Sequence, residues 1–281
     1  MPFSWGFSHT PPPVEESAQP SETEGVRLRL YFAFVRDLFN VLPQSAPGDW
    51  EELANLSPDR PTVILVSGFA ATWRSLAIMR KRLRKDGFNV LILSLNWENM
   101  SDGIRGLYSM AEQLSTLALK IRKHPKLSRS RIFLVAHSAG GLVARYYVQL
   151  LGGWHYCDRL ITLGTPHSGT WVAGLGFFTH LVLKAACLFH MLPISPLIRK
   201  INSVALPRGF HLISIHSSGD FLCYPAAAEL PEELQGHADV ESVELRDLSH
   251  SDFLLSKRCY RTLRKYLPGA IESAEAESQP G

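Results

Sequence analysis

Residues 131–143 read RIFLVAHSAGGLV, and this stretch decides how the rest of the chain can be interpreted. Its first half is a short β-branched and apolar run that is typical of a buried strand, and an apolar helical stretch follows at once. Ser138 lies at the junction. A helix that leaves close beside a strand needs small residues around the turn, here Ala136, Ala139, Gly140 and Gly141. The pattern predicts a strained nucleophile elbow, G-x-S-x-G with Ala136 in place of the first Gly. The alternative is a serine in an ordinary strand–helix turn.

Strand-like and helix-like segments alternate from residue 61 onward. Short apolar runs predict buried parallel strands at 62–67, 88–95, 131–136, 159–164, 211–216 and 242–248. Helices are predicted at about 74–86, 104–123, 139–151 and 251–267. Such alternation indicates an α/β protein with a mostly parallel sheet of about six core strands and helices on both faces.

Two motifs carry a resemblance to a known family. AHSAGG at 136–141, together with LITLGTPHSGTW at 160–171, resembles the α/β-hydrolase lipases, especially bacterial triacylglycerol lipases and carboxylesterases. The resemblance extends from about Pro61 to Leu267, and Ala136 matches a known variant of the family's motif. It implies the α/β-hydrolase fold and hydrolysis of carboxylic esters, without metal or organic cofactor.

A serine nucleophile needs an adjacent base that is itself oriented by a carboxylate. Asp220 follows the strand 211–216 in a polar turn, and His250 follows the last strand just before the final helix. Catalytic groups of open α/β sheets gather at the carboxyl ends of the strands, and this fold uses the chain order Ser, acid, His. The resembling lipases also carry their acid and histidine at these positions. We therefore predict a catalytic triad of Ser138, Asp220 and His250.

Other residues could take these roles. His137 adjoins Ser138 but should point away from it, His167 precedes the expected acid, and His216 lies in the last residues of a strand. The remaining candidates for the acid are Glu229, Asp239 and Asp247, which are less well placed after a strand end.

The oxyanion hole should use two backbone N–H groups. One belongs to Ala139, directly after the nucleophile, and the other belongs to Phe69 in the loop VSGFAATW after the first core strand. The resembling lipases usually have His-Gly where this chain has Ser67-Gly68. This departure keeps the backbone donor but removes the family's side-chain support.

Residues 171–192 interrupt the alternation with an almost wholly apolar segment. A membrane span is disfavoured by Lys184, His180 and His190, and because it would separate the strand 211–216 from its sheet. His180, Lys184 and Cys187 form a narrow polar stripe at helical spacing. We expect a helix that ends at Pro193 and Pro196, within a lid insertion at about 169–206; the alternative is a buried core helix. The candidate substrate-binding residues are Trp73, Trp171, Phe177, Phe178 and Tyr224.

The two ends of the chain differ from the middle. Residues 1–25 and 269–281 are acidic and poor in large apolar residues, so disordered tails are expected on either side of a hydrolase domain at 26–268. Seven of the 26 acids lie in these tails, which leaves 19 acids against all 29 bases and a charge of about +10 in the middle. Three helical groups of bases could bind an anionic membrane, or could be solvated helix faces. No nucleic-acid motif accompanies them, so no nucleic-acid partner is expected.

The remaining signals concern location and substrate. The four cysteines are widely spaced and the N-terminus has no signal-peptide pattern, so we expect reduced thiols and a cytoplasmic protein. Residues 26–42 should form a helix packed on the core, or an interfacial helix that makes peripheral contact with a membrane. The expected partner is a small-molecule or lipid ester. The alternatives are an acyltransferase or a fatty-acyl thioesterase that uses the same triad, and a membrane-associated binding protein without catalytic activity.

Overall fold

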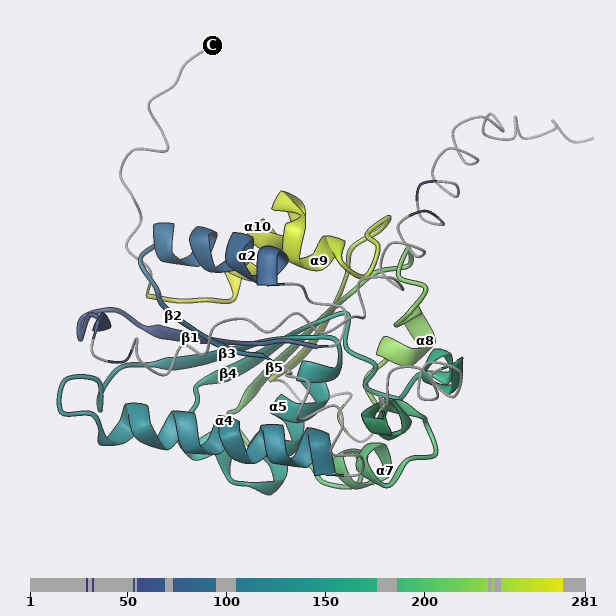
Figure 1. Cartoon of the computed structure of the whole chain (residues 1–281), viewed down its shortest axis with the longest axis horizontal. Helices are drawn as coiled ribbons and strands as arrows, with labels where there is room; N and C mark the ends of the chain where they lie inside the picture. Colours follow the sequence, from purple (N-terminus) through teal and green to yellow (C-terminus); the bar gives the residue numbers. More distant parts are fainter. Residues whose placement is uncertain are drawn as a thin grey trace, which may run out of the picture.

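The computed structural model of the chain describes residues 29, 32, 53, 55–68, 73–94, 105–175, 186–231, 234 and 239–269. At its centre lies a sheet of six parallel strands in the order β2-β1-β3-β4-β5-β6 (Figure 1). The strands are β1 Thr62–Val66, β2 Asn89–Leu93, β3 Ile132–His137, β4 Arg159–Leu163, β5 His211–His216 and β6 Val240–Glu244. The α/β class with about six parallel core strands is confirmed.

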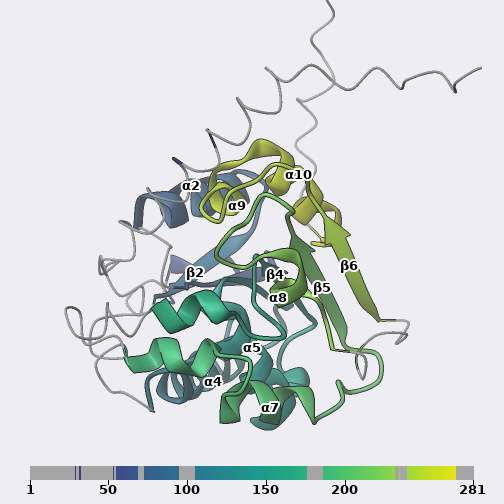
Figure 2. The same cartoon turned by 90° about the vertical axis from the view of Figure 1, so that its right-hand side faces the viewer.

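Helices cover both faces of the sheet (Figures 1 and 2). One layer contains α2 Trp73–Lys85, α9 Asp252–Leu255 and α10 Lys257–Lys265; the other contains α4 Gly106–Lys123, α5 Ala139–Leu150 and α7 Pro196–Asn202. Alternate residues of each strand face opposite layers. On β1, Val63 and Leu65 join the core under α2, whereas Ile64 and Val66 join the core under α4 and α5. Burial on both faces explains why these strands read as continuous apolar runs.

Two predicted elements need correction. The strand expected at 242–248 is β6, which begins earlier, ends at Glu244 and is partly exposed, because it lies at the edge of the sheet. The single helix expected at 251–267 is divided into α9 and α10. Ser256 lies between them and caps α10, since its hydroxyl accepts hydrogen bonds from the N–H groups of Arg258 and Cys259. The other three predicted helices are confirmed to within two residues of their predicted ends.

The predicted lid insertion begins and ends in short elements rather than in one helix. Residues 171–192 contain the 3-10 helices η4 Trp171–Leu175 and η5 Ala186–Met191, and residues 176–185 lie outside the described part. The backbone N–H of Thr170 donates to the carbonyl of Met191 at 2.7 Å, which holds the two ends of the 171–192 segment together. Pro196 does not end a helix as expected. It is the first residue of α7, where its missing N–H costs nothing, and Ser195 caps it.

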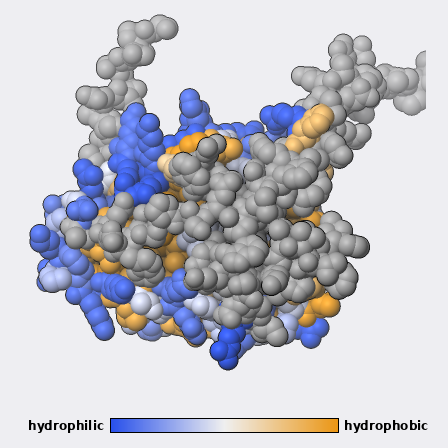
Figure 3. Space-filling view, viewed as in Figure 1, coloured by the Kyte–Doolittle hydropathy of each residue, from blue (hydrophilic) through white to orange (hydrophobic). Residues whose placement is uncertain are grey.

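The basic groups of the two helical layers lie largely at helix ends and on exposed faces, and Figure 3 shows hydrophilic side chains over the part of the surface where α2 lies. Several of these bases bind neighbouring backbone. Arg82 donates to the carbonyls of Leu255 and Ser256, and Arg122 donates to three carbonyls beyond the end of α4. These bonds join α2 to α9 and satisfy carbonyl groups after α4, so these two bases have a structural role.

The tails at 1–25 and 270–281, and most of the predicted helix at 26–42, lie outside the described residues. Within that segment Arg29 and Phe32 are helical. In the part of the chain that the structure describes, no helix is both long and apolar enough for a bilayer span.

Candidate active site

Ser138 lies at a strained turn between β3 and α5. Its φ of 56° and ψ of −130° place a non-glycine residue in a region that such residues rarely adopt. The strand before it is central, because Ala136 pairs with Val66 on β1 and with Thr162 on β4. The turn therefore presents the serine at the carboxyl edge of the sheet, directly before the first residue of a helix.

The small residues around Ser138 are required by close backbone approach. A Cβ on Gly140 would lie 2.5 Å from the carbonyl oxygen of Val66, and one on Gly141 would lie 2.0 Å from Thr165 Oγ1. Thr165 Oγ1 itself donates to the carbonyl of Ser138 at 3.0 Å. On the opposite side, a Cβ on Gly68 would lie 2.5 Å from the Cβ of Ser138. Three chain segments therefore hold the turn in place.

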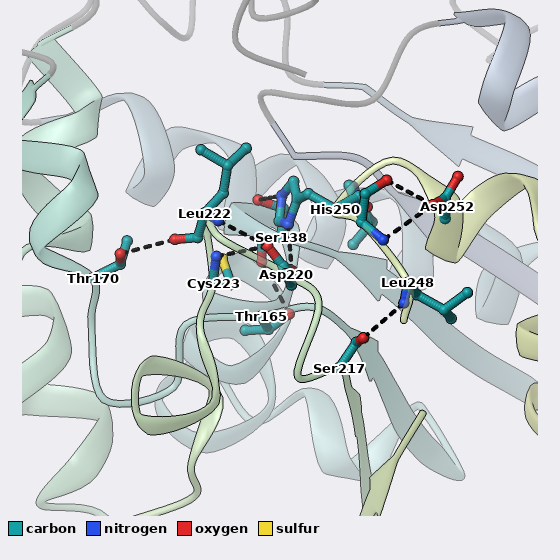
Figure 4. A network of polar contacts seen from close by, with 12 residues as sticks. Ser138, Thr165, Thr170, Ser217, Asp220, Leu222, Cys223, Leu248, His250 and Asp252 are labelled. Carbon is teal, nitrogen blue, oxygen red and sulfur yellow. Dashed lines mark hydrogen bonds and ion pairs between the residues drawn. The ribbon is translucent and has the colours of Figure 1, made fainter. Parts of the chain in front are cut away.

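Ser138, His250 and Asp220 form one hydrogen-bonded chain (Figure 4). His250 Nε2 lies 2.8 Å from Ser138 Oγ, and His250 Nδ1 lies 2.7 Å from Asp220 Oδ2. A carboxylate only accepts, so Nδ1 carries the proton and Nε2 is free to accept the serine proton. Ser138 is 5% exposed, and the other two side chains are 1–2% exposed. The structure thus brings together three residues that are far apart in sequence.

The acid is positioned by its own turn. Asp220 Oδ1 accepts the backbone N–H groups of Leu222 and Cys223, both at 2.9 Å, which leaves Oδ2 to face His250. The hydroxyl of Ser217 accepts the N–H of Gly219 at 3.1 Å and the N–H of Leu248 at 3.0 Å. Since Leu248 belongs to the loop after β6, this serine joins the acid loop to the histidine loop.

The charge of Asp220 determines how His250 titrates. Burial by itself lowers the pKa of this imidazole, but the adjacent carboxylate outweighs that effect and holds the pKa of His250 well above its usual 6.5. The neighbouring His137 behaves in the opposite way. Burial, together with the nearby His250, lowers the pKa of His137 to about 3, so its ring stays neutral.

The competing residues lie elsewhere. His137 Nε2 donates to the backbone carbonyl of His250 at 3.0 Å, so this histidine holds the catalytic loop without facing Ser138 Oγ. His167 is buried between Thr162 and Arg145, and burial lowers its pKa well below the usual value. His216 lies near Ser242 on β6. Of the acids, Asp239 binds the N–H of Gly209, and neither Asp247 nor Glu229 has a described bond to His250.

The structure also places part of the predicted oxyanion hole and pocket. Ala139 begins α5 directly after the nucleophile, whereas Phe69 lies outside the described residues. Trp171 is 58% exposed, and Tyr224 is half-buried at the start of the short helix α8 Pro225–Ala228. Trp73 begins α2 with a side chain that is not described, and Phe177 and Phe178 fall outside the described part.

Two contacts at the site were missed by the sequence analysis. Thr165 secures the Ser138 carbonyl, and the buried Cys223 thiol lies within 4.8 Å of ligand atoms of both Asp220 and His250. Burial raises the pKa of the Cys223 thiol above its usual value, although the neighbouring His250 acts against it. The GTPHSG turn could have indicated Thr165, because a threonine that follows a strand at this edge can reach the elbow. Cys223 gave no comparable signal.

Comparisons with known proteins agree with this fold. The fold is the α/β-hydrolase fold, and the chain of Ser138, His250 and Asp220 has the geometry of a serine hydrolase triad. The family described as "Putative serine esterase (DUF676)" matches residues 59–184, a region that includes Ser138 but neither Asp220 nor His250. No curated protein matches the chain in sequence.

Similar solved structures include three hydrolases. An α/β-hydrolase enzyme from the metagenome of lagoon sediments of Mar Chica, Morocco, has a TM-score of 0.56 at 13% identity, over 75% of this chain and 91% of that one. A Paleococcus ferrophilus monoacylglycerol lipase has a TM-score of 0.52 at 13% identity, over 75% of this chain and 93% of that one. The Pyrococcus furiosus esterase Pf2001 has a TM-score of 0.52 at 18% identity, over 74% of this chain and 81% of that one. These findings confirm the α/β-hydrolase fold and the likeness to lipases and esterases, and they support a serine hydrolase of ester substrates.

Proposed function

We propose that this protein hydrolyses carboxylic esters of lipids or other acyl groups through an acyl-enzyme on Ser138. The observation that carries the proposal is the hydrogen-bonded chain from Asp220 through His250 to Ser138 Oγ, at a strained turn directly before α5. The strain supports a functional reading, because a positive φ at a non-glycine residue costs energy, on the order of 1–3 kcal/mol, and is retained where geometry matters.

The reaction follows from these contacts. Ser138 Oγ attacks the ester carbonyl carbon while His250 Nε2 takes the hydroxyl proton, and Asp220 stabilises the resulting imidazolium. The carbonyl oxygen becomes an oxyanion that the N–H of Ala139 stabilises from the start of α5. When the C–O bond to the alcohol breaks, His250 returns the proton to the leaving oxygen. Water then attacks the acyl-enzyme by the same route, which releases the acid and restores the Ser138 hydroxyl.

A lipid substrate is supported by apolar side chains at the same edge of the sheet. Trp171 and Phe221 are 58% and 47% exposed. Trp171 directly follows Thr170, and Phe221 directly follows the catalytic acid Asp220. Thr170 Oγ1 donates to the carbonyl of Leu222 at 2.9 Å, which brings the loops that carry these two aromatic residues together near the acid. Exposed aromatic residues beside the site are suited to an apolar acyl chain or a lipid surface.

The test is covalent labelling with a fluorophosphonate, followed by hydrolysis of p-nitrophenyl esters of increasing chain length. We expect the wild-type protein to be labelled and Ser138→Ala to be unlabelled, with a loss of turnover of about 10⁴- to 10⁶-fold. Ser130→Ala is the matched control, since Ser130 is another buried serine next to β3 but at its amino end. Labelling of Ser138→Ala would disprove the proposed nucleophile. A preference for long chains identifies a lipase, and a preference for short chains identifies an esterase.

A further inference from the structure

A carboxylate, a thiol and an imidazole converge beside Ser138 (Figure 4). Cys223 lies three residues after Asp220, and His250 comes from the loop after β6. Each side chain offers one possible ligand atom: a carboxylate oxygen of Asp220, the sulfur of Cys223 and a ring nitrogen of His250. These three atoms all lie within 4.8 Å of one another. All three side chains are buried.

The thiol has no part in the acyl transfer proposed above. The acid turn uses only the backbone N–H of Cys223, which donates to Asp220 Oδ1. Alanine or serine would supply the same N–H, so that bond does not require sulfur. The thiol nevertheless lies beside the base that takes the serine proton, with its sulfur within 4.8 Å of a ring nitrogen of His250.

Sulfur, imidazole nitrogen and carboxylate oxygen are the donor set that Zn²⁺ prefers, and three protein ligands suffice when water or a hydroxyl takes the fourth position. With bonds of about 2.0–2.3 Å, a tetrahedral site holds its ligand atoms about 3.3–3.6 Å apart. The atoms of this cluster lie within 4.8 Å of one another, so on binding no pair would need to approach by more than about 1.5 Å. Side-chain rotation can provide a movement of that size.

We propose that Asp220, Cys223 and His250 form an inhibitory site for Zn²⁺ or a chemically similar thiophilic ion. The ion binds the thiolate of Cys223, so one proton leaves that thiol for the solvent. It also occupies an imidazole nitrogen lone pair of His250 and an oxygen of Asp220. The histidine can then no longer accept the Ser138 proton with the carboxylate in place, and acylation stops. Any approach that admits an ester to Ser138 Oγ also brings a small ion to His250, whose Nε2 lies 2.8 Å from that oxygen.

Binding can be tested without enzymatic activity. Ser138→Ala keeps all three ligands, so after chelator treatment it should bind one Cd²⁺ per chain and show the ultraviolet absorption of a cadmium–thiolate bond. Adding Cys223→Ala should abolish that absorption, and Cys223→Ser, which preserves side-chain volume, should do the same. Adding Cys259→Ala is the control, because Cys259 is also a buried free thiol but belongs to α10 and packs in the hydrophobic core. Equal cadmium absorption with and without Cys223 would overturn the proposal.

Inhibition is the second test, and it alone rests on the proposed function. Zn²⁺ should reduce ester hydrolysis by the chelator-treated wild-type protein, and EDTA should restore it. In Cys223→Ser, the Zn²⁺ concentration that halves each protein's own activity should rise by at least about tenfold, whereas in Cys259→Ala it should not change. Equal sensitivity of Cys223→Ser and wild type would refute the inhibitory role. Cadmium binding without any esterase activity in zinc-free wild type would leave the ion site standing and reject the ester hydrolase instead.

Discussion

Replacing Asp220 by Asn should invert the proton arrangement of the triad rather than simply weaken it. Asp220 Oδ1 accepts two backbone N–H groups at 2.9 Å, so the amide oxygen of the variant must occupy that position. The amide nitrogen then replaces Oδ2, 2.7 Å from His250 Nδ1, and donates to it. His250 must carry its proton on Nε2, which faces Ser138 Oγ at 2.8 Å and can no longer accept the serine proton.

The expected loss in turnover is about 10⁴-fold, the effect that the wrong histidine tautomer has in serine protease triads, or about 5 kcal/mol of transition-state stabilisation. The assay is kcat for a short soluble p-nitrophenyl ester, with thermal unfolding measured in parallel to verify the fold.

Asp252→Asn is the matched control for this substitution. Asp252 lies two residues after His250, and its Oδ2 accepts the N–H and the hydroxyl of Ser249. An amide can keep its oxygen at that position, so the control should lose less than about tenfold, or about 1.4 kcal/mol. If Asp220→Asn stayed folded and retained activity within tenfold of wild type, the tautomer argument would be refuted and the acid would have to be sought at Glu229 or Asp239.

Two further predictions concern pH and chain length. Because the base must be neutral and Asp220 raises the pKa of His250, kcat/KM should fall as the pH drops through a midpoint above 6.5; a midpoint at or below 6.5 would contradict the described coupling. Replacing Phe177 and Phe178 with Ser should strongly impair hydrolysis of long-chain esters but spare a short soluble ester, if residues 169–206 act as a lid. Equal loss on both substrates, in a variant with an unchanged circular dichroism spectrum, would show that this segment supports the core.

The central part of the fold could be predicted because one rule governs it. A strand buried on both faces needs a continuous apolar run, and such runs mark β1, β3 and β4 within a residue or two. Parallel strands then bring their carboxyl ends to one edge, so Ser138, Asp220 and His250 could be expected close together although 112 and 30 residues separate the bonded pairs. The edge strand β6 is not buried on both faces and so does not need a continuous apolar run. It is partly exposed, and its sequence VESVE carries little apolar signal, so its position was predicted too late in the chain.

Side-chain contacts between loops could not be predicted in this way. Ser217 joins the acid loop to the histidine loop, Ser256 divides the last helix, and Thr165 secures the Ser138 carbonyl, yet a serine or threonine in a turn has many possible partners. Cys223 is the sharpest example. The motif Asp-x-x-Cys supplies only two ligands, and the third, His250, reaches them from 27 residues beyond Cys223 through the turn that Asp220 itself organises. The same hydrogen bonds that orient the base therefore bring the thiol to it, and a metal site at this position is a consequence of how the triad is built.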